Sequence, residues 1–182
     1  MFFIKISDKF FSNWCTLIFI IPILLFSNGT AAFPQTLNIF QGDVTGLPIP
    51  RFVSAKSNKM NVRRGPNSGH QIDWVYKLRG VPLKVTAEYE NWRKIEDFEG
   101  EGGWAHARLL SGTRFVIFLN DKTTLKRKPN KNALDIVVIG RGVIAKLISS
   151  SDDWGEVSLK GYKGWVLRDR VWGLLENEII DR

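Results

Sequence analysis

The chain has 182 residues, enough for one ordinary domain or two very small ones. With 44% hydrophobic, 12% aromatic and 24% charged residues, its composition is that of a globular protein and excludes disorder throughout. Lysine and arginine number 26 against 18 aspartates and glutamates, a formal net charge of +8. One cysteine and two histidines leave almost nothing for a disulfide framework or a metal cluster, so we expect no metal and no cofactor.

Residues 1–32 have the order of a secretory signal peptide. A basic start with Lys5 and Lys9 precedes an apolar run over residues 14–26, and small or polar residues then lead to a cleavage site predicted after Ala32. A retained membrane anchor is the alternative, but these 13 residues fall short of the roughly 20 that span a bilayer. We therefore expect a periplasmic or secreted protein that meets the membrane only through its uncleaved signal peptide and loses Cys15 on cleavage.

Residues 33–51 predict an extended lead-in. They are rich in proline and glycine and show neither helical periodicity nor strand alternation. We therefore place the start of the first folded domain at Phe52.

From Phe52 onward the sequence passes twice through the same order of motifs. Residues 60–67, 79–85, 92–95 and 103–105 correspond in turn to residues 123–130, 141–147, 154–157 and 164–166. A repeat of about 62 residues predicts a duplication, with domain 1 at 52–112, domain 2 at 113–176 and a C-terminal tail at 177–182. Only residues 111–113 clearly separate the two copies, and so short a link predicts a fixed mutual orientation.

Each pass predicts β-structure. Ile72, Trp74 and Tyr76 alternate with more polar positions, and further strands are indicated around residues 81–87 and 92–98. The second pass repeats this rhythm, and no segment shows a long apolar stripe at helical spacing. The sequence therefore predicts an all-β fold of small barrels.

The motifs together resemble the bacterial SH3-like domain. They are the run Met-Asn-Val-Arg-Arg-Gly-Pro at residues 60–66, a hydrophobic strand, Gly80, Trp-Arg-Lys-Ile at 92–95, and the Gly-Trp pair at 103–104. The resemblance covers about residues 52–173 in two copies, although the second has Lys128 where the first has the Gly before Pro. It implies two tandem SH3-like barrels of a kind that commonly binds envelope or cell-wall components. Such domains often accompany peptidoglycan peptidase domains that use Cys and His. These residues contain no such catalytic domain.

Catalysis is not expected. Cleavage would remove the one thiol, and His70 and His106 are interpreted as exposed or partly packed side chains. Six carboxylates of copy 1 are interpreted as a solvated acidic edge on turns and strand ends, not as a pair facing across a cleft. They are Glu88, Glu90, Glu96, Asp97, Glu99 and Glu101.

The candidate ligand face combines basic and aromatic side chains. Copy 1 carries Lys56, Lys59, Arg63 and Arg64, and Trp92 should point away from the core residue Ile95 because neighbouring strand positions alternate. Copy 2 has a matching basic cluster, and its Trp154 should be exposed opposite Val157 for the same reason. That cluster consists of Lys122, Lys126, Arg127, Lys128 and Lys131. Solvated charge and tryptophans that merely cover a barrel edge are the alternatives.

These features predict an exported, non-enzymatic module that binds a cell-envelope component such as peptidoglycan. The alternative is an adaptor or inhibitor that binds another exported protein, such as a wall hydrolase. Nucleic acid is not expected as a partner, because a signal peptide takes the chain out of the cytoplasm.

Overall fold

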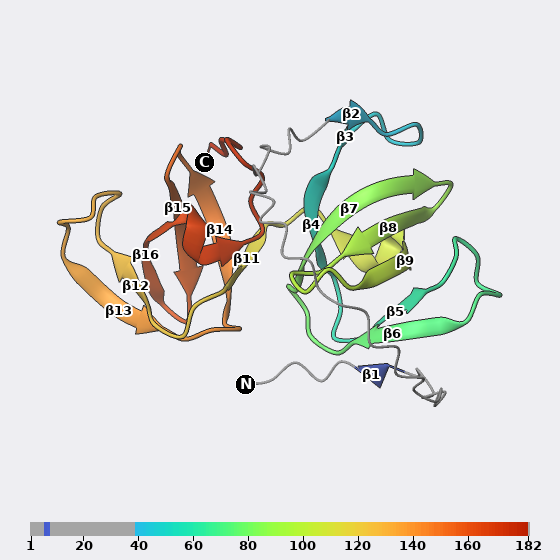
Figure 1. Ribbon diagram of the computed structural model, residues 1–182, viewed down its shortest axis with the longest axis horizontal. Helices are drawn as coiled ribbons and strands as arrows, with labels where there is room; N and C mark the ends of the chain where they lie inside the picture. Colours follow the sequence, from blue (N-terminus) through green and yellow to red (C-terminus); the bar gives the residue numbers. More distant parts are fainter. Residues whose placement is uncertain (1–5, 8–38, 182) are drawn as a thin grey trace, which may run out of the picture.

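The computed structural model describes residues 6–7 and 39–181, and this part of the chain is all-β, as predicted (Figure 1). Its helical elements are two short 3₁₀ turns, η1 (Ala107–Leu109) and η2 (Arg168–Arg170). No helix within these described ranges is long and apolar enough to cross a membrane. The predicted signal peptide and the cleavage site after Ala32 lie outside them, apart from the short strand β1 (Ile6–Ser7).

Two antiparallel sheets share one topology. The first, ordered β1-β6-β5-β9-β8-β7-β4-β10, consists of β1 with β4 (Arg51–Ala55), β5 (Met60–Arg63), β6 (Ile72–Tyr76), β7 (Pro82–Tyr89), β8 (Trp92–Glu96), β9 (Gly102–His106) and β10 (Leu110–Ser111). The second, ordered β13-β12-β16-β15-β14-β11-β17, consists of β11 (Phe115–Phe118), β12 (Thr123–Lys126), β13 (Asp135–Ile139), β14 (Ile144–Ser150), β15 (Trp154–Leu159), β16 (Tyr162–Leu167) and β17 (Val171–Trp172). Apart from β1, which has no counterpart in the second sheet, the two orders match strand for strand once β4 is set against β11, so the sequence repeat is a structural repeat.

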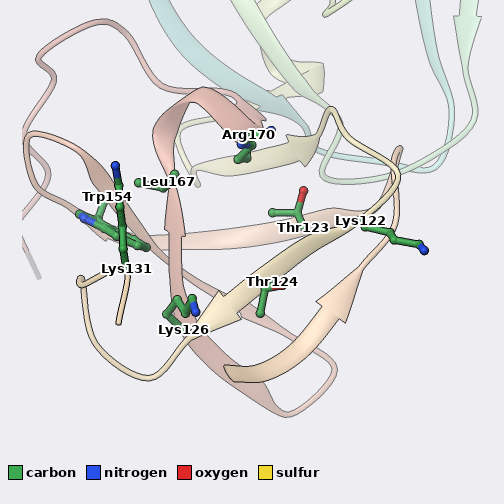
Figure 2. Close-up of a pocket in the computed structure, with 8 residues that line it drawn as sticks. All are labelled: Lys122, Thr123, Thr124, Lys126, Lys131, Trp154, Leu167 and Arg170. Carbon is green, nitrogen blue, oxygen red and sulfur yellow. The ribbon is translucent and has the colours of Figure 1, made fainter. Parts of the chain in front are cut away.

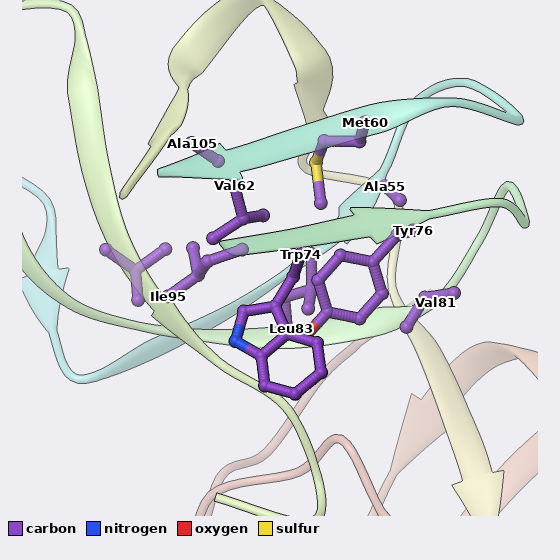
Figure 3. Close-up of a cluster of buried hydrophobic side chains, with 10 residues drawn as sticks. Ala55, Met60, Val62, Trp74, Tyr76, Val81, Leu83, Ile95 and Ala105 are labelled. Atoms are coloured by element: carbon purple, nitrogen blue, oxygen red, sulfur yellow. The ribbon is translucent and has the colours of Figure 1, made fainter. Parts of the chain in front are cut away.

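Each sheet surrounds its own apolar core. In copy 1 the alternation predicted for β6 is realised, because Trp74 and Tyr76 are buried beside Leu83, which is fully buried (Figure 3). The core of copy 2 is built around Phe118, Leu125 and other aliphatic side chains. The transfer of such side chains out of water, at roughly 25 cal/mol per Å², is the main force that closes each sheet.

The end of the lead-in is more ordered than we expected. Strands β2 (Phe40–Gln41) and β3 (Pro48–Ile49) form a hairpin that docks on copy 1 through Glu88 of β7. The Glu88 carboxylate, with its side chain 1% exposed, accepts hydrogen bonds from the backbone and hydroxyl of Thr45 and from Arg51. Strands of two residues are too short to show alternation, and Glu88 lies 43 residues from Thr45, so the sequence pattern gave no sign of this contact.

Docking of this hairpin should depend on pH through Glu88. Burial opposes ionisation, but the hydrogen bonds from Thr45 and Arg51 outweigh it and lower the pKa of Glu88 from 4.5 to about 2. The charge on Glu88 therefore stabilises the fold above about pH 4.5, and that stability is lost as the pH falls toward 2. We expect Glu88→Gln to cost at most about 3 kcal/mol at pH 6 and much less at pH 2.5, measured by urea unfolding.

Glu90→Gln is the matched control, because Glu90 is an exposed carboxylate two residues further along the chain. A cost for Glu88→Gln that stays constant between pH 6 and 2.5 would contradict the prediction.

The two copies contact each other where the chain passes from one to the other. The Ser54 hydroxyl donates to the carbonyl of Thr113 at 2.8 Å, and the Phe52 ring stands edge-on to Trp172 with ring centroids 4.7 Å apart. Ile144 of copy 2 packs against the core of copy 1. The short link is thus accompanied by polar and apolar contacts that hold the tandem together.

Candidate functional site

The four basic residues proposed for copy 1 lie at two ends of one strand. Lys56 and Lys59 are exposed in the turn before β5, whereas Arg63 and Arg64 lie at its far end. At about 3.3 Å per residue, roughly 16 Å separates Lys59 from Arg64. Arg63 donates to the carbonyl of His70 at 2.6 Å, and Arg64 donates to Asp73 at 2.8 Å. The cluster is therefore split, and its two arginines already hold internal partners.

Trp92 lies as its strand phase predicted. It is half-buried while Ile95 is fully buried, and its ring meets His106 edge-on with centroids 5.3 Å apart. Strand register pairs Trp92 with His106, and pairs Arg63 with Trp104, so these side chains share the outer face of the sheet. Of the basic residues proposed for copy 1, Arg63 is the one that this register brings to the face of Trp92. Trp104 and His106 belong to the same face. From the sequence, Trp104 was recognised only as part of the Gly-Trp pair, and His106 was interpreted as an exposed or partly packed side chain.

Copy 2 carries a groove of about 270 Å³ lined by cationic side chains and Trp154 (Figure 2). Strand β12 supplies one side, β15 and β16 supply Trp154 and Leu167, and η2 supplies Arg170. The lining residues are Lys122, Thr123, Thr124, Lys126, Lys131, Trp154, Leu167 and Arg170. Three members of the basic cluster predicted for copy 2 thus come together, while Arg127 and Lys128 point elsewhere and are exposed.

Trp154 is more buried than we expected. Strand phase predicted an exposed ring, and the structure leaves it 8% exposed. A second hollow of about 560 Å³ also borders Trp154, and the segment 174–177 lines it together with Trp154 and Leu167. Copy 1 has no counterpart of this C-terminal segment, because its chain continues directly into copy 2.

The residues that we assigned to a C-terminal tail are bound to copy 2 as far as the structure describes them. Glu178 forms a bidentate ion pair with Arg114, whose two terminal guanidinium nitrogens lie 2.5 and 2.9 Å from the carboxylate oxygens. Ile180 packs against the core of copy 2. Burial opposes ionisation of Glu178, but the hydrogen bonds from Arg114 and the backbone of Leu175 lower its pKa. These contacts fix the segment that forms one wall of the second hollow.

The groove keeps a net positive charge. Lys126 is paired with Asp135 at 2.5 Å, and Arg170 lies 3.4 Å from Asp169. Among the described residues, Lys122 and Lys131 form no ion pair. The hydroxyl oxygen of Thr123 is buried and has no hydrogen-bond partner within the same part of the chain, on a residue that is 4% exposed. A polar ligand group could satisfy this oxygen and the free ammonium groups together.

Two of the six carboxylates in copy 1 do not belong to a solvated edge. Glu88 holds the β2–β3 hairpin, and Asp97 is 4% exposed and accepts from the Tyr76 hydroxyl at 2.8 Å. Burial, followed by the neighbouring charge of Asp97, raises the pKa of Tyr76. The turn amides of Glu99 and Glu101 also donate to Asp97. Both buried carboxylates are thus saturated by structural donors, and within the described ranges no group of His, Cys, Asp and Glu could hold a metal ion.

The comparison with known families settles the class of this fold. A family profile described as the bacterial SH3 domain matches residues 56–112 and 122–173, one segment in each sheet. The chain belongs to the bacterial SH3 domain family. Its two SH3 domains are the two structural repeats, and such domains are typically binding modules without catalytic activity.

Other comparisons add little to the assignment of two SH3 domains. No curated protein matches the chain. Among solved structures, NlpC2 from Trichomonas vaginalis is similar at 12% identity and a TM-score of 0.32. The match covers 68% of this chain, which spans about half (48%) of that structure.

Proposed function

We propose that this protein is exported and binds a component of the cell envelope such as peptidoglycan, without catalysing a reaction. The groove of the second SH3 domain carries the proposal, because it places unpaired ammonium groups beside the half-buried Leu167 and the Thr123 hydroxyl, which has no partner within the described ranges. Export rests on the signal-peptide pattern of residues 1–32.

The chemistry of the groove suits a polar polymer. Leu167 and the small exposed part of Trp154 offer apolar contacts to a sugar ring or peptide, and cationic side chains raise the local concentration of ligands that carry negative groups. Ligand sites are commonly concave, with a few convergent polar groups that fix the orientation of the ligand. The ligand would lie across β12 and the start of β15, with Lys122 and Arg170 at its sides.

Co-sedimentation with isolated peptidoglycan tests the proposal. We expect the chain from Phe33 onward to pellet with peptidoglycan, and the double variant Lys122→Gln/Arg170→Gln to bind about tenfold more weakly, since two charged contacts are lost. Lys146→Gln is the matched control, because Lys146 is exposed on β14 and does not line the groove. A protein that stays in the supernatant would overturn the proposal.

Export has its own test. We expect N-terminal sequencing of protein recovered outside the cytoplasm to begin at Phe33. A chain that begins at Met1 in the membrane fraction would show a retained anchor instead.

One observation favours an adaptor or inhibitor as the second candidate. The β2–β3 hairpin exposes apolar side chains, including Phe40 at 57% and Leu47 at 51% exposure. Exposed apolar groups that cluster in this way are typical of protein contacts. If the protein captures another exported protein from envelope extract through this hairpin, Phe40→Ser/Leu47→Ser should abolish the capture and leave peptidoglycan binding unchanged.

A further inference from the structure

We propose that the second SH3 domain selects a zwitterionic ligand, a short peptide segment whose carboxylate and amine lie in two adjoining hollows that both border Trp154. This inference rests on the proposed function, since it specifies the chemistry recognised at the same site. Two hollows meet at Trp154, and their charges are opposite.

The groove described above is the cationic side. Its charged lining residues are Lys122, Lys126, Lys131 and Arg170, and two of these form no ion pair among the described residues. Thr123 contributes the buried hydroxyl that has no partner there (Figure 2). A ligand carboxylate is an acceptor that ammonium groups and a hydroxyl can satisfy together.

The second hollow is the acidic side. Its lining includes four carboxylate residues, which are Asp152, Asp153, Asp169 and Glu176. Two cations, Lys131 and Arg168, also line it, so its four carboxylates outnumber its cations. The Arg168 guanidinium donates to the carbonyls of Ser151, Leu175 and Glu178 and is held against the wall. A ligand amine would therefore meet exposed carboxylates in this hollow.

The two hollows share Lys131, Trp154 and Leu167, so a single ligand can reach both. Three extended residues span about 10 Å, which is enough to cross the width of a tryptophan ring. Leu167, which is half-buried, and the small exposed part of Trp154 would contact the middle of the ligand, and one charged group would lie in each hollow.

This arrangement also determines which ligands are rejected. A polyanion that follows the groove would meet the carboxylates of Asp152 and Asp153 as it passes Trp154. A polycation would meet Lys122 and Arg170. Unfavourable charges of this kind discriminate between ligands even where the attractive contacts are modest.

Trialanine and its blocked forms provide a direct test. Trialanine with free termini should shift the indole N–H resonance of Trp154 in the ¹⁵N-labelled chain, with Trp154→Phe used to assign that resonance. N-acetyl-trialanine and trialanine amide should each bind about fivefold more weakly, because each has lost one charged contact. Blocked forms that bind as tightly as trialanine, or no shift at millimolar trialanine, would overturn the inference.

Variants on the two sides should separate the two charges. Lys122→Gln/Arg170→Gln should no longer distinguish trialanine from its amide but should still distinguish it from the acetylated form. Asp152→Asn/Asp153→Asn should behave in the opposite way, and Lys146→Gln should retain both preferences. The inference fails if either double variant loses both preferences or retains both, because each hollow would then not recognise a single charge.

The outcome is separable from that of the proposed function. Charge-selective trialanine binding without peptidoglycan sedimentation would contradict peptidoglycan as the ligand and support the zwitterion-selective site. Peptidoglycan sedimentation without trialanine selectivity would do the reverse.

Discussion

Replacing Gly103 by alanine is expected to lower the free energy of unfolding by at least about 3 kcal/mol. Gly103 has φ +150°, a conformation that residues with a side chain rarely adopt. A Cβ at this position would lie 2.6 Å from the carbonyl oxygen of Arg63 and 3.0 Å from a methyl group of Val62. The Arg63 oxygen belongs to the backbone of β5, so it cannot move aside without disrupting the sheet.

The same geometry explains why the Gly-Trp pair recurs in both copies. Arg63 pairs with Trp104, and Lys126 pairs with Trp165, so the residue before each tryptophan lies where two strands approach closely. At Gly164 a Cβ would lie 2.9 Å from the carbonyl oxygen of Lys126 and 2.8 Å from the end of the Ile136 side chain. The Ile136 methyl can move, so we expect Gly164→Ala to cost less than Gly103→Ala.

Urea denaturation of the chain from Phe33 onward measures both effects. Gly112→Ala is the matched control, because a Cβ there meets no atom within 4 Å. We expect Gly112→Ala to change stability by less than about 0.5 kcal/mol. A cost for Gly103→Ala within that same range would show that β5 and β9 do not approach as closely as described.

Strand alternation and motif order allowed much of the fold to be predicted. Trp74 and Tyr76 alternate with half-buried or polar neighbours, so their burial follows from the pleat alone. The repeated order of motifs predicted two copies, and the matching strand orders of the two sheets, apart from the added strand β1, confirm it. Local patterns of this kind depend on neighbours along the chain, which a sequence displays directly.

The candidate site depends on contacts that no local pattern displays. Arg170 reaches the groove because a 3₁₀ turn follows β16, and Lys131 reaches it from the loop before β13. Trp154 shares the lining of the second hollow with a segment twenty and more residues further along the chain. Glu88 was assigned to a solvated edge because its partners, Thr45 and Arg51, precede it by 43 and 37 residues. Lys131 was predicted as part of the basic cluster, whereas Arg170 was not foreseen and Glu88 was misplaced because tertiary contacts are not displayed by strand phase or composition.

Phe52→Ala is expected to uncouple the two SH3 domains. Phe52 is 5% exposed, and its ring meets Trp172 edge-on at 4.7 Å with an interplanar angle of 87°. The guanidinium of Arg114 lies 5.6 Å from the same ring and also binds Glu178 and the carbonyl of Gly173. Phe52 thus belongs to the first sheet but contacts two parts of the second domain. These are Trp172 of β17 and Arg114, which binds Glu178 of the C-terminal segment.

Truncation to alanine should cost about 3–5 kcal/mol, because it opens a cavity and removes an aromatic pair. Part of this loss falls on the contact between the domains, so the cooperativity of unfolding should change as well as its midpoint. We expect one calorimetric transition for the wild-type chain from Phe33 onward and two separated transitions for Phe52→Ala.

Phe40→Ala is the control for the loss of a phenyl ring, because Phe40 is 57% exposed on the β2–β3 hairpin and its truncation leaves no buried cavity. It should keep one transition with a nearly unchanged midpoint. A Phe52→Ala variant that also unfolds in one transition would mean that the link at residues 111–113, the Ser54–Thr113 hydrogen bond and Ile144 suffice to couple the domains. The aromatic contact would then add stability without determining whether the tandem unfolds as one unit.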